Sequence, residues 1–173
     1  CFFVALKLPN LFRRIFGEGA MSAAFIPVLS GVLSKSGKRS ADVFFSKVFS
    51  ILLIFLLSFL ILAEIFMPYL VKLLAPGFNT NPEKIVLAVN LSRLTFPFLL
   101  FICLTSLMGA YLNTLGKFAS MAVTPIILNL SIISVLIFLF NDGDQVHISK
   151  HLSISVSVAG VTVSYTHLRA HET

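Results

Sequence analysis

The sequence predicts an all-α integral membrane protein. Of its 173 residues, 57% are hydrophobic and only 12% are charged, whereas a soluble domain carries about 25% charged residues. The mean hydropathy is +0.98. Short polar stretches divide the chain into apolar segments that can cross a bilayer as helices, since about 20 helical residues suffice. We expect about four transmembrane helices and a truncated fifth.

The first apolar segment spans residues 1–33 and contains two prolines, Pro9 and Pro27. Proline lacks an N–H and disfavours helical geometry in the residue before it. We therefore expect a helix break or kink at Pro9, with Asn10 as the cap of the restarted helix, and a second bend near Pro27. The restarted half-helix would present free N–H groups and a positive dipole end inside the membrane, as the broken helices of transporters do.

Two adjacent arginines, Arg13 and Arg14, lie within this segment. Arginine near the bilayer centre costs roughly 3 kcal/mol on insertion scales, so it usually faces a watery cavity or a partner. One interpretation is a polar site for an anionic group, with Glu18 paired to Arg14 four residues before it. The other is an anchor whose arginines reach from a helix end to the headgroups. A non-transporting scaffold would need no buried cation.

The linker at residues 34–47 is the most basic stretch of the chain, so we place it in the cytoplasm. A second apolar segment follows at 48–75. The turn at 76–82 contains two prolines and a glycine, which stop the helix and reverse the chain. We place residues 76–84 outside, because the charges of this loop cancel.

The third apolar segment spans residues 85–112 and contains Arg93 and Pro97. Arg93 either lies at the membrane interface or enters the same cavity as Arg13 and Arg14. If it enters the cavity, it is a candidate binding residue. A short inner loop at 113–117 then leads to a fourth segment at 118–140, in which a proline is tolerable because membrane helices satisfy the freed carbonyl locally.

The polar stretch at 141–150 suits the outer side, and a fifth apolar segment starts near Leu152 and stops almost at once. Residues 163–173 break the hydrophobic pattern and resemble a non-native tail, so we exclude them from fold reasoning. The chain opens inside an apolar segment without a methionine, which is typical of a fragment.

The composition argues against several function classes. The net charge of +6 is not accompanied by a basic amphipathic stripe, so nucleic acid is not an expected partner. Cys1 and Cys103 indicate neither a disulfide framework nor a metal site, and no cofactor is expected. A membrane enzyme acting on a polyprenyl phosphate is an alternative, but its closely spaced carboxylates, Asp142 and Asp144, are far in sequence from the arginines.

Several motifs resemble those of one transporter family. Residues 2–14 read FFVALKLPNLFRR, followed by FGEGA at 16–20 and AFIPVL at 24–29. Together these are similar to the second transmembrane region of the MurJ (MviN) lipid II flippases. The stretches LAPGF at 74–78 and RLTFP at 93–97 resemble an outer-loop motif and the fourth helix of that family.

The resemblance covers residues 1–162 and implies a bacterial inner-membrane, multi-pass transporter of the multidrug/oligosaccharidyl-lipid/polysaccharide superfamily, not an enzyme. Such proteins have two helical lobes around a central cavity, and this chain would hold helices two to five and the start of six from the first lobe. By the same resemblance, Arg13, Arg14 and Glu18 would engage the diphosphate and sugar-peptide head of lipid II. Its other expected partners are membrane lipids and the remaining helices of the full-length protein. Another lipid-linked oligosaccharide or small-molecule exporter of this superfamily is the alternative.

Overall fold

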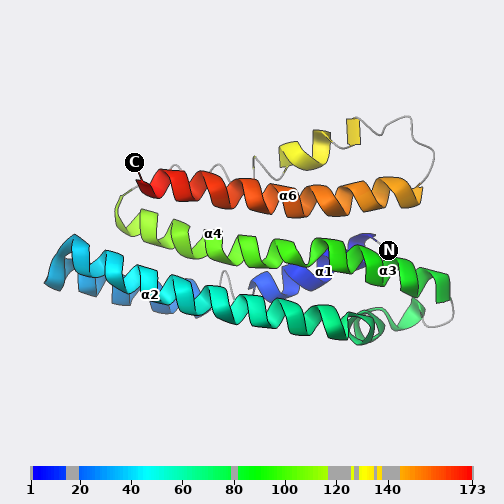
Figure 1. Ribbon diagram of the computed structural model, residues 1–173, viewed down its shortest axis with the longest axis horizontal. Coiled ribbons are helices and arrows are strands. Elements are labelled where there is room, and N and C mark those ends of the chain that lie inside the picture. Colours follow the sequence, from blue (N-terminus) through cyan, green and yellow to red (C-terminus); the bar gives the residue numbers. More distant parts are fainter. Residues whose placement is uncertain are drawn as a thin grey trace.

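The computed structural model describes residues 2–14, 20–78, 82–116, 126, 129–134, 136–137 and 145–172. In this part of the chain the elements are α1 (Phe2–Arg13), α2 (Ala20–Leu74), the short 3₁₀ helix η2 (Pro76–Phe78), α3 (Pro82–Thr95), α4 (Pro97–Thr114) and α6 (Gln145–Glu172). The long helices run side by side, with α4 between α2 and α6, and α1 packs against α3 (Figure 1).

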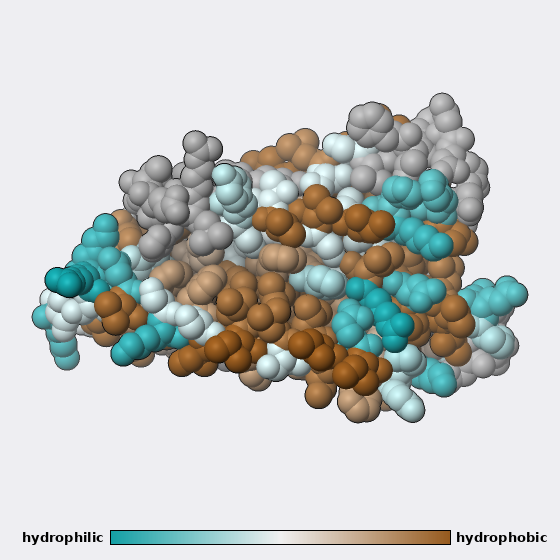
Figure 2. Space-filling view, viewed as in Figure 1, coloured by the Kyte–Doolittle hydropathy of each residue, from teal (hydrophilic) through white to brown (hydrophobic). Residues whose placement is uncertain are grey.

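Two helical stretches, Ala23–Leu74 and Pro82–Thr114, are long and apolar enough to cross a membrane. Their outer faces are apolar: large hydrophobic side chains such as Ile54, Ile61 and Leu73 are exposed along α2. Figure 2 shows hydrophobic side chains over the middle of one face and hydrophilic ones mainly toward the ends of the helices. A helix bundle with an apolar exterior is the arrangement expected in lipid, so the predicted all-α membrane fold is confirmed.

The chain reverses inside α2 at Gly37, which has φ 76° and ψ 177°. The residues on both sides of it are helical, so the predicted loop at 34–47 is wrong: a single glycine makes the turn. Phe25, before the turn, stacks on Phe44, after it, with ring centroids 6.0 Å apart. At the same end, the Tyr111 hydroxyl of α4 donates a hydrogen bond to the Asp42 carboxylate. These contacts hold the two helical halves of α2 together at the turn, with no loop between them.

A break at Pro9 is also wrong, because α1 continues through Pro9 to Arg13; a kink at this position stays a prediction. A proline removes the N–H that would bond the carbonyl four residues earlier, here that of Ala5. The Thr95 hydroxyl of α3 lies 3.1 Å from this Ala5 carbonyl oxygen. A neighbouring helix thus supplies the missing donor, which is how membrane helices tolerate proline. Asn10 consequently lies inside α1 and caps nothing.

The break occurs instead at Pro97, where α3 ends at Thr95 and α4 begins. The two helices continue one another in Figure 1 and form the single span predicted at residues 85–112. The Leu94 carbonyl at this break accepts a hydrogen bond of 2.6 Å from the Ser157 hydroxyl of α6. A hydroxyl group from another helix therefore also serves a backbone carbonyl at this break.

The short fifth apolar segment that was predicted to start near Leu152 lies inside α6, which is helical from Gln145 to Glu172. Among the described residues, α6 is not one of the stretches apolar enough to cross a membrane. The polar residues that ended the hydropathy pattern face the bundle. Ser164 forms a hydrogen bond of 3.2 Å with Thr105, and a Cβ on Gly160 would lie 3.0 Å from Cβ of Phe101. Small polar residues that allow close approach are typical of helix interfaces in membranes.

We expect Gly37→Ala to lower the stability of the chain, because an L side chain rarely adopts this backbone conformation, at a cost of about 1–3 kcal/mol. Gly31→Ala is the matched control: Gly31 is helical, nothing lies within 4 Å of a Cβ placed there, and alanine is favoured over glycine in a helix. Thermal unfolding in detergent micelles should show a lower midpoint for the first variant only. Equal midpoints would contradict a turn set by Gly37.

Candidate functional site

Helix α1 has two chemically different faces. Ala5, Leu8 and Pro9 are buried against the bundle, and their spacing of three and four residues marks one side of a helix. Lys7 and Asn10 are exposed on the other side. The buried side packs α1 against the bundle, and the polar side faces outward from it.

The end of α1 is held by an aromatic cluster. The Phe12 ring lies 5.0 Å from the Phe59 ring of α2 and 5.9 Å from the Phe96 ring at the break between α3 and α4, both in edge-on geometry. Phe59 and Phe96 lie inside the two stretches that can span a membrane. Arg13, the last residue of α1, therefore lies next to aromatic side chains of both stretches.

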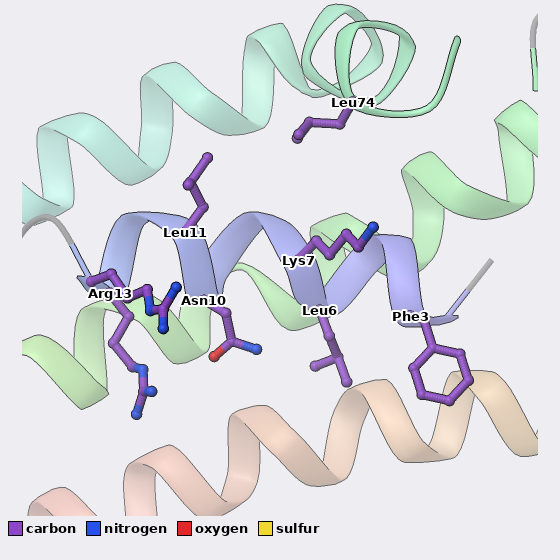
Figure 3. A pocket seen from close by; sticks show the side chains of 8 residues that line it. Phe3, Leu6, Lys7, Asn10, Leu11, Arg13 and Leu74 are labelled. Atoms are coloured by element: carbon purple, nitrogen blue, oxygen red, sulfur yellow. The ribbon is translucent and has the colours of Figure 1, made fainter. Parts of the chain in front are cut away.

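A pocket of about 610 Å³ runs along the polar side of α1 (Figure 3). Its polar lining comes from Lys7, Asn10, Arg13 and Arg14. The rest of the lining is apolar and consists of Phe3, Leu6, Leu11 and Leu74. Arg14 directly follows α1, and Leu74, at the end of α2, is the lining residue from a different helix; in Figure 3 it faces Leu11.

The pocket combines three cations and a carboxamide with an apolar wall. Arginine presents a planar fork of N–H donors that matches phosphate or carboxylate oxygens in pairs, and lysine adds a compact point charge. Asn10 can donate through its amide. This donor set fits an anionic group of several oxygens attached to an apolar body. The structure thus brings Arg13 and Arg14 together in one pocket.

Lys7 was not predicted as a site residue. The signal was its spacing: Lys7, Asn10 and Arg14 are separated by three and four residues and so share one side of a helix. A helix break at Pro9 would have destroyed this register. Glu18 lies outside the described residues, so its expected pairing with Arg14 stays a prediction.

Arg93 is placed elsewhere, in an ion pair with Glu64 of α2. Nε of Arg93 lies 3.7 Å from Oε2 of Glu64, with the two side chains 47% and 30% exposed. Its guanidinium also donates a hydrogen bond of 3.4 Å to the Glu64 backbone carbonyl. Arg93 is not among the residues that line the α1 pocket. Its geometry favours a link between α2 and α3.

Comparison with known proteins shows a consistent likeness. A family model described as "Lipid II flippase MurJ" matches residues 1–170. The chain is 44% identical over 158 residues to a "Probable lipid II flippase MurJ" of Rickettsia prowazekii, covering 91% of this chain and 30% of that protein. It is 42% identical over 162 residues to a protein of the same description from Rhizobium tropici, again covering 30% of the relative.

A solved structure, "Lipid II flippase MurJ, inward closed conformation", superposes with a TM-score of 0.72 at 30% identity. The match covers 95% of this chain and 34% of that one. The present chain therefore spans about a third of the length of the proteins it matches.

We expect the polar side of α1 to be in contact with water. In a variant whose native cysteines are replaced by alanine, Asn10→Cys should react with a water-soluble maleimide. Leu8→Cys, at a position 1% exposed, should not. Ile61→Cys is the control for lipid exposure, because Ile61 is 62% exposed on an apolar face and a thiol in hydrocarbon stays protonated and unreactive.

The measurement is the labelling rate of each variant in membrane vesicles. Asn10→Cys that labels no faster than Ile61→Cys would show that this side of α1 faces lipid, and it would contradict a hydrated pocket.

Proposed function

Because this chain belongs to the lipid II flippase MurJ family, we propose that it forms part of a flippase for lipid II, the lipid-linked peptidoglycan precursor. The protein would move this precursor from the cytoplasmic to the outer leaflet of the bacterial plasma membrane, as a multi-pass transporter and not as an enzyme. The observation that carries the proposal is the pocket on α1, where Lys7, Arg13 and Arg14 lie beside an apolar wall.

The physical problem is to carry a diphosphate through a layer of low dielectric constant. An anion that leaves water loses a large hydration free energy, which only opposite charges and hydrogen bonds at close range can offset. We assign this role to Arg13 and Arg14, whose forks can each hold two phosphate oxygens. Lys7 and Asn10 add a charge and a donor on the same side of α1.

The apolar part of the pocket suits the other half of such a ligand. Phe3, Leu6 and Leu11 line the pocket beside the cations, so a polyprenyl chain next to the diphosphate would find hydrocarbon and not water. The chain spans about 30% of the length of its relatives. We therefore propose that the opposite wall of the cavity comes from other helices of the full-length protein.

The orientation follows from the basic residues at the turn in α2. Lys35, Lys38 and Arg39 are exposed there, and cytoplasmic loops carry the excess of such residues. We propose that the Gly37 turn is cytoplasmic and that η2 lies on the outer side. The start of α1 then points toward the outer side as well, and Arg13 lies about 16 Å further along α1 in the cytoplasmic direction, at 1.5 Å per residue.

Substitution of the two arginines tests the proposal. The test protein is a full-length family member that carries residues 1–162 of this chain. Arg13→Ala and Arg14→Ala should each weaken lipid II binding by roughly 30- to 150-fold, the equivalent of about 2–3 kcal/mol for a charge-assisted contact. Arg→Lys should weaken binding less, since lysine keeps the charge but loses the fork.

Lys72→Ala is the matched control, because Lys72 is an exposed cation of α2 outside the pocket. The affinity of each purified variant for lipid II is measured after its folding is checked. If both Arg→Ala variants bind like the wild type while remaining folded, the arginines are anchors that snorkel to the headgroups, and the site assignment fails.

A further inference from the structure

Pro9 leaves one backbone group of α1 in need of a partner from outside that helix. The Ala5 carbonyl would accept a hydrogen bond from the N–H at position 9, which proline lacks. Ala5 is 0% exposed, so water does not reach this residue to replace the missing donor. A buried carbonyl without a partner is destabilising, so the identity of its actual partner is important.

That partner is Thr95 of α3. Its hydroxyl oxygen lies 3.1 Å from the Ala5 carbonyl oxygen, and the side chain is fully buried. The carbonyls of Leu91 and Ser92 lie equally close, at 3.1 Å each. The Ser92 carbonyl already accepts the Phe96 N–H at 2.9 Å, and Leu91 stands four residues before Thr95 inside α3, where the helix supplies its donor. The Ala5 carbonyl is the acceptor for which this hydroxyl matters.

The bond acts on the side of α1 opposite the pocket. At 3.6 residues per turn, Arg14 is displaced from Ala5 by about 180° around the helix axis. The Thr95 hydrogen bond holds the first half of α1 against α3, and the packing of Phe12 against Phe59 and Phe96 holds its end. Two contacts on one side of a rigid helix fix its rotation, and this rotation determines where the side chains of the opposite side point.

We propose that Thr95 is a positioning residue for the pocket, which touches no ligand and sets the rotation of α1 so that Asn10, Arg13 and Arg14 face the cavity. The inference rests on the proposed lipid II site, whose affinity it affects. Pro9 and Thr95 form one unit in this account, because the hydroxyl compensates for the N–H that the proline lacks.

The test is a double-mutant cycle in the full-length family member that carries residues 1–162. Thr95→Val keeps the shape of the side chain but removes the hydroxyl, and Thr95→Ser keeps the hydroxyl. Pro9→Ala restores the N–H that can bond the Ala5 carbonyl. Thr105→Val is the matched control: Thr105 is a buried threonine of the same span whose hydroxyl contacts Ser164 of α6 and not α1.

Two readouts are recorded for every variant. One is hydrogen–deuterium exchange of residues 2–13, which needs no ligand, and the other is affinity for lipid II. Thr95→Val should speed exchange in α1 and weaken lipid II binding, each by about three- to tenfold, the scale of one lost hydrogen bond. Thr95→Ser should resemble the wild type. In the Pro9→Ala background, Thr95→Val should have little further effect on either readout.

The inference is overturned if Thr95→Val changes α1 exchange no more than Thr105→Val does, or if its effect is the same with and without Pro9. If the unmodified protein does not bind lipid II, the proposed function fails. The exchange cycle then still decides, independently, whether Thr95 holds α1 through the Ala5 carbonyl.

Discussion

The need to pair every buried backbone group is the constraint on which this bundle depends, and the hydrogen bond from Thr95 to the Ala5 carbonyl meets it at Pro9. In hydrocarbon, each backbone group must find its partner inside the protein. Pro9 removes one donor from α1, and the break at Pro97 frees the carbonyl of Leu94 at the end of α3. Hydroxyl groups of other helices, those of Thr95 and Ser157, complete both sites. The same contacts connect α1 to α3 and α3 to α6. The hydrogen bonds that satisfy these carbonyls therefore also hold the helices together.

The two faces of α1 connect this packing to the chemistry of the pocket. A cation inside a membrane is stable only where water or an opposite charge can reach it. The buried face of α1 is occupied by Ala5, Leu8 and Pro9, whereas Lys7 and Arg14 are exposed. Arg93, in contrast, meets its opposite charge within the bundle, at Glu64. The neighbours that the fold provides thus decide whether a cation pairs with a carboxylate, as Arg93 does, or is available to a ligand.

The sequence predicted the helical membrane fold, because it follows from composition and local spacing. Arg13 and Arg14 both line the α1 pocket, and their role in binding stays a prediction. The sequence did not predict an unbroken α1, because the partner that satisfies Ala5 is 90 residues away. It also did not predict that Ser157 and Ser164 of α6 form hydrogen bonds to other helices. Local rules for proline and serine show which groups require a hydrogen-bond partner. Only tertiary contacts show whether that partner is present.

The most direct test of this account is a cryo-electron microscopy structure of the full-length family member carrying this segment, with lipid II bound. The account predicts diphosphate density in contact with the guanidinium groups of Arg13 and Arg14, while the Thr95 hydroxyl keeps its distance of 3.1 Å from the Ala5 carbonyl oxygen. Diphosphate density elsewhere in the cavity, with both arginines extended to the headgroup layer, would contradict it.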